Sequence, residues 1–103
     1  MKQYKIKYSK LAISDLERMK QEVYLASEDY LVTEKYVDDM FDKIENLTKR
    51  PETGIPLIYE DIPTGYYFVV HKLYYAFYRF EGDCILVDRV LYGKSDYIRT
   101  LGL

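Results

Sequence analysis

The period of the hydrophobic residues changes once along this chain, and that change, at Pro51, constrains the fold more than any other feature. Before Pro51, apolar residues recur every three to four positions in two stretches, which is typical of amphipathic helices. After Tyr66, three runs are rich in aromatic and β-branched residues, which is typical of strands. Because the helices precede the strands instead of alternating with them, the order predicts an α+β domain.

A short strand is expected ahead of the helices. Residues 2–8 alternate apolar with polar side chains, which predicts a strand with one buried face. Lys2, Lys5, Lys7 and Lys10 are expected on its solvated side, where charges discourage pairing between sheet edges. A basic rim for RNA is the alternative role of these lysines.

Two helices should then pack as an αα-hairpin. Ser9 is placed to cap the first helix, whose apolar stripe runs from residue 12 to an expected end near residue 27. Thr33 can cap the second helix, whose stripe covers residues 36–47. Pro51 cannot continue a helix, so the second helix should end before it.

The rest of the chain should form most of the sheet. Residues 51–65 hold all three prolines and two of the five glycines, so we expect a surface connection with at most a short extended piece. Short separators between the following runs indicate antiparallel hairpins. The three expected strands are residues 66–71, 74–80 and 84–92.

This order predicts a three-stranded antiparallel meander with both helices on one face of the sheet. The opposite face is then expected to be uncovered, and a tyrosine-rich open face is where a ligand or partner would bind. Ser95 or Asp96 can cap a last helical turn. A chain of 103 residues, 49% of them hydrophobic, suffices for one core, so residues 1–103 are expected to form a single domain.

Composition excludes several classes of function. The net charge of −2 argues against nonspecific nucleic-acid binding, although a local basic site remains open. The single cysteine, Cys84, and the single histidine, His71, exclude an internal disulfide and a zinc-finger spacing, so no metal or cofactor is expected. We expect both to be structural, Cys84 buried in a strand and His71 at a turn. Because no apolar run reaches the roughly 18 residues of a membrane span, a cytoplasmic protein is expected.

Five segments carry a resemblance to a known family. They are residues 8–12 (Tyr-Ser-Lys-Leu-Ala), 15–16 (Asp-Leu), 50–51 (Arg-Pro), 74–79 (Tyr-Tyr-Ala-Phe-Tyr-Arg) and 89–97 (Arg-Val-Leu-Tyr-Gly-Lys-Ser-Asp-Tyr). In this order and spacing, the chain resembles the RelE/ParE superfamily of type II toxin–antitoxin toxins. The resemblance implies a compact cytoplasmic α+β protein that is wrapped by a cognate antitoxin. It also implies growth inhibition and plasmid stabilization, through either cleavage of ribosome-bound mRNA or inhibition of DNA gyrase; a homodimer of the free protein is left open.

The resemblance further implies a set of site residues. In ribonuclease members of the superfamily, basic residues on the sheet stabilise the scissile phosphate, and a residue near the C-terminus transfers a proton or stacks on a base. The positions of this chain that match the pattern are Arg79, Arg89, Tyr92, Lys94 and Tyr97.

Two cationic positions of the ribonuclease members differ in this chain. Lys94-Ser95 stands where many relatives carry two arginines, and Tyr66-Tyr67 stands where many carry one. Because losing one preorganised charge typically costs about 10²–10³ in rate, these differences favour a ParE-like inhibitor that binds gyrase and performs no chemistry. The alternatives are a RelE-like, metal-independent mRNA endoribonuclease and a decayed toxin that retains only antitoxin binding.

The candidate site residues also have structural interpretations. Arg79 contacts a phosphate or an antitoxin carboxylate, or it forms an ion pair with a neighbouring carboxylate. Arg89 is a site residue, or it forms a salt bridge with Asp15 or Glu17 of the first helix. Tyr92 is expected to pack or stack more than to transfer protons, because an unperturbed tyrosine pKa of about 10 makes a poor base at neutral pH.

Overall fold

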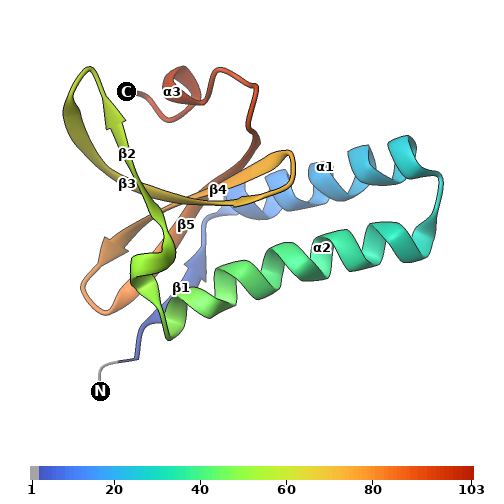
Figure 1. The fold of residues 1–103 in the computed structure, drawn as a ribbon, viewed down its shortest axis with the longest axis horizontal. Coiled ribbons are helices and arrows are strands. Elements are labelled where there is room, and N and C mark those ends of the chain that lie inside the picture. The colour runs from blue at the N-terminus through green and yellow to red at the C-terminus, as the bar shows by residue number, and fades with distance from the viewer. Residues whose placement is uncertain (1–2) are drawn as a thin grey trace.

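The structure, a computed structural model, describes residues 3–103 as a five-stranded sheet packed against a helical hairpin (Figure 1). Lys2, expected on the solvated side of the first strand, lies outside the described residues. No helix within residues 3–103 is long and apolar enough to cross a membrane. In chain order the elements are β1 (Lys5–Tyr8), α1 (Lys10–Ser27), α2 (Tyr30–Glu45), the 3₁₀ turns η1 (Asn46–Thr48) and η2 (Pro51–Thr53), β2 (Ile55–Tyr59), β3 (Ile62–His71), β4 (Tyr74–Glu81), β5 (Cys84–Tyr92) and α3 (Tyr97–Thr100).

The sheet has the strand order β1-β5-β4-β3-β2. β1 runs parallel to β5, and all other neighbouring strands are antiparallel. α1 and α2 run side by side along one face of this sheet (Figure 1). The expected α+β class, with a helical hairpin on one face, is confirmed.

Residues 51–65, expected to be a surface connection, contain an additional strand. β2 pairs with β3, with Ile55 opposite Phe68, so the meander has four strands instead of three. β3 begins at Ile62, earlier than expected. Pro56 is tolerated because β2 is an edge strand, where alternate N–H groups face away from the sheet. Pro56 therefore marks the edge of the sheet and not an interruption of it.

Both long helices begin at side-chain caps. Ser9 Oγ accepts a hydrogen bond from the first turn of α1 at 2.9 Å, as expected. α2 is capped by Asp29 and not by Thr33, because Asp29 Oδ1 accepts the N–H groups of Leu31 and Val32. Thr33 lies one turn inside the helix, where its hydroxyl donates to the Asp29 carbonyl at 2.8 Å. A carboxylate suits this position because it also interacts favourably with the helix dipole.

The main core lies between the sheet and the helical hairpin. Met19 of α1 and Met40 of α2 are fully buried there, as are Tyr78 of β4 and Val87 of β5. Ile6 and Tyr8 of β1, and Tyr4 just before it, pack against this core with half-buried side chains, as the alternating pattern predicts. The helices are thus held to the sheet by one continuous apolar layer.

The opposite face of the sheet is half covered, and not open as expected. The chain turns back after β5, and α3, capped by Asp96, lies against this face near the end of β5 (Figure 1). The residues that pack together in this smaller core include Phe77, Leu91, Tyr97, Ile98 and Leu101. The sequence pattern predicted the last helical turn, but it did not predict that the apolar residues of this turn cover the second face of the sheet.

The helical hairpin extends beyond the strands (Figure 1). Its far end therefore carries apolar side chains that have no core to enter. This hairpin tip consists of Tyr24, Leu25, Tyr30, Leu31 and Val32, which are between 43% and 76% exposed. The hydrophobic side chains of the tip face solvent or a partner.

Gly54→Ala is expected to lower the free energy of unfolding by about 2 kcal/mol, as overpacking does in well-filled cores. The backbone of Gly54 lies against the ring of Tyr78, and an added methyl group would overlap the phenol of Tyr78. Urea unfolding measures the change, with Glu52→Ala on the exposed η2 turn as the control. If Gly54→Ala unfolds at the wild-type urea concentration, this close approach is wrong.

Candidate functional site

Arg89 is bound to helix α1. Its guanidinium donates to the carboxylate of Asp15, at 2.7 Å from Nε and 3.0 Å from Nη2. Asp15 is 2% exposed, so the pair is a buried two-point interaction. Burial alone would raise the pKa of Asp15, but hydrogen bonds from Arg89 and the Val90 N–H outweigh it and hold that pKa below its usual value. Of the two interpretations of Arg89, the structure contains the salt bridge to the first helix.

The Asp15 carboxylate also takes the place of a missing strand. β1 ends opposite Val87, while β5 continues. Beyond that point, Ser9 donates its hydroxyl to the Asp88 carbonyl at 2.7 Å, and Asp15 Oδ2 accepts the Val90 N–H at 3.0 Å. The ion pair is therefore part of the architecture of β5.

Arg79 lies on the face of the sheet away from the helical hairpin. Its Nε donates to Asp88 Oδ2 at 3.0 Å, and its Nη2 lies 3.4 Å from the Glu81 carboxylate. The Tyr66 hydroxyl donates to the same Asp88 oxygen at 2.8 Å. A β-bulge makes Asp88 the extra residue of β5. Asp88 and Arg89 nevertheless point to opposite faces of the sheet, Asp88 toward Arg79 and Arg89 toward Asp15 of α1. The charge of Arg79 is matched within the chain.

The other three candidate residues follow one another at the end of β5. Tyr92 is 39% exposed, and its ring centroid lies 5.9 Å from that of Tyr74. Lys94 is exposed in the turn before α3. The ring of Tyr97 packs against Phe77, with centroids 5.0 Å apart, and belongs to the smaller core.

The five candidate residues do not converge on one point. In the β4–β5 ladder, Arg79 is opposite Leu86, whereas Tyr92 is opposite Tyr74. At about 3.3 Å per residue, the six positions between Leu86 and Tyr92 separate the two ends by roughly 20 Å. Arg89 is held by α1 between them. The two larger hollows described below are lined by none of the five residues.

His71 is the buried last residue of β3, immediately before the turn. Its ring packs edge-on against Tyr36 of α2, with centroids 4.8 Å apart, and its Nε2 has no hydrogen-bond partner within residues 3–103. Burial, together with the nearby charges of Lys43 and Lys72, lowers the pKa of His71. The side chain is therefore neutral at physiological pH. Cys84 is half-buried at the start of β5.

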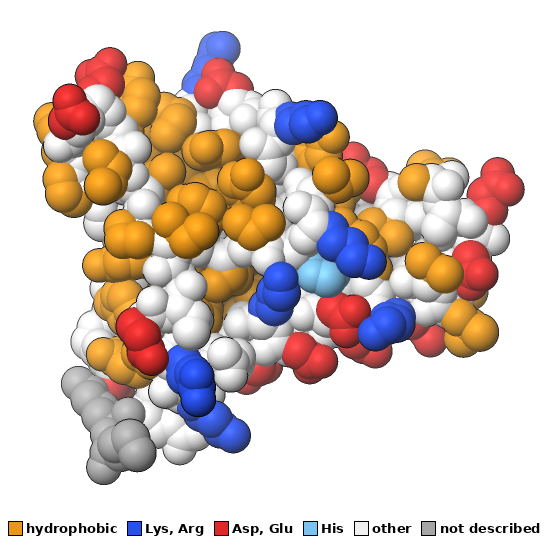
Figure 2. Space-filling model, in the orientation of Figure 1, with side chains coloured by type: hydrophobic (Ala, Val, Ile, Leu, Met, Phe, Trp, Pro, Cys, Tyr) orange, Lys and Arg blue, Asp and Glu red, His pale blue; other side chains and the backbone are white. Residues whose placement is uncertain are grey.

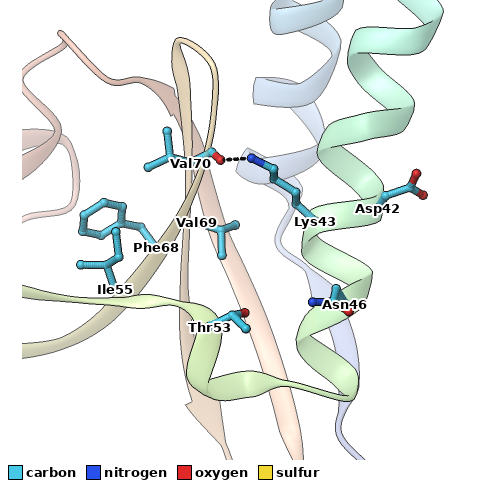
Figure 3. Close-up of a pocket in the computed structure, with 8 residues that line it drawn as sticks. All are labelled: Asp42, Lys43, Asn46, Thr53, Ile55, Phe68, Val69 and Val70. Atoms are coloured by element: carbon cyan, nitrogen blue, oxygen red, sulfur yellow. Dashed lines mark hydrogen bonds between the residues drawn. The ribbon is translucent and has the colours of Figure 1, made fainter.

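A hollow of about 590 Å³, the edge hollow, lies between α2 and the outer edge of β3 (Figure 3). Lys43 crosses from α2 to β3, where its Nζ donates to the Val70 carbonyl at 2.6 Å. Sequence reasoning missed Lys43, because it looks like any other residue of a polar helix face. The hollow is lined by Asp42, Lys43, Asn46, Thr53, Ile55, Phe68, Val69 and Val70.

A second hollow, of about 660 Å³, lies against the hairpin tip. Its lining mixes apolar and charged side chains, which is typical of surfaces that bind proteins. Within residues 3–103, no three His, Cys, Asp or Glu side chains are grouped to hold a metal ion. The second hollow is lined by Glu17, Lys20, Gln21, Tyr24, Leu25, Tyr30 and Thr33.

Residues 6–97 match the family model of the ParE toxin of the type II toxin–antitoxin system parDE. The chain belongs to this family. A chain from the chromosomal ParDE system of P. aeruginosa is 18% identical with a TM-score of 0.72, over 89% of this chain and 98% of that one. A chain of the RelBE2 toxin–antitoxin complex from Mycobacterium tuberculosis is 18% identical with a TM-score of 0.56, over 87% and 98%. At these identities the likeness shows a shared fold; among curated proteins, no sequence matches.

The RelE/ParE resemblance of the sequence is thus confirmed. In this ParE-family toxin, the arginines at 79 and 89 are both engaged by carboxylates of the chain itself. Exposed apolar side chains lie on the hairpin tip and also on β2 and the start of β3, where Ile55, Ile58 and Ile62 are 51%, 58% and 65% exposed. The candidate interaction surfaces of the toxin therefore include the tip, this β2–β3 hairpin and the edge hollow.

Arg89→Met is expected to destabilise the toxin by about 3 kcal/mol, because it leaves the Asp15 carboxylate as a buried charge without its main partner. Arg18→Met is the matched control. Arg18 also contacts Asp15, at 2.7 Å, but its side chain is 53% exposed, so its loss should cost less than about 1 kcal/mol. Urea unfolding of both variants makes the comparison, and equal losses would contradict the structural role of Arg89.

The toxin is expected to lose stability as the pH falls from about 7 to about 5, because His71 has a lowered pKa when folded and the unfolded chain binds that proton first. His71→Phe keeps an aromatic ring against Tyr36 and removes the titrating group. Its thermal midpoint should therefore change less over this pH range than that of the wild type. Parallel pH profiles of the two proteins would show that His71 is not responsible.

Proposed function

We propose that this chain is the toxin of a toxin–antitoxin pair that acts by binding a protein target, DNA gyrase, and not by cutting RNA. Membership of the ParE toxin family supports the toxin role. The observation that carries the choice of mechanism is the engagement of Arg79 and Arg89 by carboxylates of the same chain.

Cleavage of RNA by its 2′-hydroxyl builds negative charge on the phosphate, which fixed cations must stabilise. Here Asp15 lies 2.7 Å from Arg89, and Asp88 lies 3.0 Å from Arg79. Freeing Arg89 for a phosphate would strip a buried carboxylate of its partner, which is strongly unfavourable. The buried pair supports a structural role for Arg89 and weakens the ribonuclease alternative. The pair of Arg79 adds less, because the Arg79 side chain is 45% exposed.

The overall charge of the toxin supports the same choice. Binding to ribosomes and mRNA is dominated by neutralisation of phosphates, which favours a basic surface. The chain carries 15 basic and 17 acidic residues, with a net charge of −2. A protein target requires no such surface, because apolar contact supplies most of the affinity in protein complexes.

We infer that the cognate antitoxin covers the hairpin tip. Contiguous exposed apolar side chains mark interaction surfaces, and Leu25 and Leu31 are 74% and 76% exposed there. The adjoining hollow of about 660 Å³ offers a concave seat for an amphipathic segment. The antitoxin would thereby bury the side chains that have no place in the core of the toxin.

The test is a supercoiling assay with purified toxin and DNA gyrase, run beside an assay with ribosomes and mRNA. Supercoiling is expected to be inhibited at a stoichiometric excess of toxin, and the message should stay intact. Arg79→Ala should change neither result, because Arg79 is paired within the chain. Adding the cognate antitoxin should restore supercoiling.

Two outcomes would contradict the proposal. Unaffected supercoiling at excess toxin would remove gyrase as the target. Cleavage of ribosome-bound mRNA that disappears in Arg79→Ala or Lys94→Ala would establish the ribonuclease alternative instead. Circular dichroism of each variant confirms that it is folded before either assay.

A further inference from the structure

The acidic side chains of the toxin are concentrated at the projecting end of the helical hairpin. Residues 21–34, which span the turn between α1 and α2, contain four carboxylates and no lysine, arginine or histidine. Because the whole chain carries 15 basic and 17 acidic residues, the rest of it has a small excess of positive charge. The negative charge of the toxin is therefore local. The four carboxylates belong to Glu22, Glu28, Asp29 and Glu34.

No cation of the chain neutralises these carboxylates. All four side chains are exposed, and within residues 3–103 none of them forms an ion pair. Two have a role in the fold, since Asp29 caps α2 and Glu22 accepts a hydrogen bond from the Tyr74 hydroxyl at 3.0 Å. Glu28 and Glu34 have no hydrogen bond from a side chain of the same part of the protein. Their charges are therefore available to a partner.

Glu28 occupies a position where the helix itself would favour a different residue. It follows the last residue of α1 with a φ of 53°, in the left-handed region that favours glycine. It also places a negative charge at the negative end of the helix dipole, and the last turn of α1 contains no basic residue to offset it. The stability of α1 therefore does not account for a glutamate here.

The carboxylates surround apolar side chains. Figure 2 shows apolar and acidic side chains together at the projecting end of the hairpin, with lysines nearer the sheet. The second hollow, which lies against the hairpin tip, shares Lys20 with a neighbouring hollow of about 360 Å³ that Val37 also lines. Among the described residues, the two linings contain Lys20 as their one cation and the three carboxylates of Glu17, Glu34 and Asp38. The surface around the tip is thus both apolar and acidic.

The backbone of the tip offers no edge for strand pairing. The N–H and C=O groups of a helix are bonded within it, and Asp29 Oδ1 accepts the free N–H groups of Leu31 and Val32 at the start of α2. A partner must therefore bind this surface through side chains. An amphipathic helix does so, because its apolar residues, three to four positions apart, enter a hydrophobic surface as a row of anchors.

We propose that the segment of the antitoxin that covers the hairpin tip is a cationic amphipathic helix. Its apolar side chains contact Leu25 and Leu31 and enter the second hollow. Lysines or arginines on both sides of this apolar row face the carboxylates of Glu28 and Glu34. The inference rests on the proposed function, which places the antitoxin on the tip, and it adds the chemistry of the segment that binds there.

The apolar and the charged contacts have different effects. Burial of the exposed leucines supplies most of the affinity, but it does not distinguish one apolar helix from another. A single exposed charge pair contributes little and is weakened by salt. Several carboxylates of one sign act together, because they repel acidic segments and accelerate the approach of basic ones. The charge around the tip therefore selects which apolar helix binds.

The first experiment measures how fast the cognate antitoxin associates with full-length toxin, by biolayer interferometry at about 0.05 M and about 0.5 M salt. Glu28→Gln/Glu34→Gln should slow association at least about fivefold at low salt, and the difference from the wild type should disappear at high salt. Glu52→Gln/Glu60→Gln is the matched control. It removes the same charge from exposed positions beside β2, away from the hairpin, and should behave as the wild type.

The second experiment titrates isotope-labelled toxin with two capped helical peptides, observed by NMR. Both peptides carry leucines at the same positions, three and four residues apart, and they differ in having lysines or glutamates beside the leucines. The lysine peptide should shift the amides of residues 24–32 and bind at least about tenfold more tightly than the glutamate peptide. Equal affinities, or tighter binding of the glutamate peptide, would overturn the inference.

Leu25→Ser/Leu31→Ser separates this inference from the proposed place of the antitoxin. If this variant, folded by circular dichroism, binds the antitoxin as the wild type does, the antitoxin does not cover the tip and both fail. If it binds weakly while Glu28→Gln/Glu34→Gln associates at the wild-type rate at both salt concentrations, the antitoxin covers the tip but its segment is not a cationic helix. Inhibition of gyrase is decided by the supercoiling assay in either case.

Discussion

The strands of this sheet differ in length, and the structure depends on how the excess length is satisfied. β5 has nine residues and its neighbour β1 has four; β3 has ten and its neighbour β2 has five. A strand that is longer than its neighbour has backbone N–H and C=O groups that no strand pairs, and these groups need other partners. On β5, Ser9 and the Asp15 carboxylate supply them from the start of α1. On β3, Lys43 of α2 does the same. The helical hairpin is therefore attached to the sheet by charged groups as well as by its apolar face.

This constraint explains why some features could be predicted from the sequence. The stripes of the helices, the cap at Ser9 and the alternation of the first strand are local patterns, and each was expected in the right place. The salt bridge of Arg89 to Asp15 was one of two stated interpretations of that arginine. The predictions that were wrong depended on which strands pair with each other, and the sequence does not show this. β2 was missed because it contains a proline, Pro56, and nothing local distinguishes such an edge strand from a loop.

The covering of the second face and the role of Lys43 were beyond the sequence for a related reason. Tyr97 and Leu101 read as a last helical turn, and only the direction of the chain after Gly93 brings that turn back over the sheet. Lys43 matters because the Val70 carbonyl points toward α2, which depends on the register of β3. The candidate site was carried over from the family resemblance, position by position. The five candidate residues carry the expected polar side chains. How far apart these side chains lie depends on the bulge at Asp88 and on the position of α1, which the sequence does not show.

The overhang of the helical hairpin has a consequence for the evolution of such toxins. The halves of α1 and α2 nearer the sheet hold the core, whereas residues such as Leu25 and Leu31 support nothing beneath them. Exchanging them has little effect on folding, because substitutions at exposed positions usually change the free energy of unfolding by less than about 0.5 kcal/mol. Selection can therefore change which partner the tip binds without changing the β-sheet. With the antitoxin on the tip, as proposed, new toxin–antitoxin pairings can diverge on an unchanged scaffold.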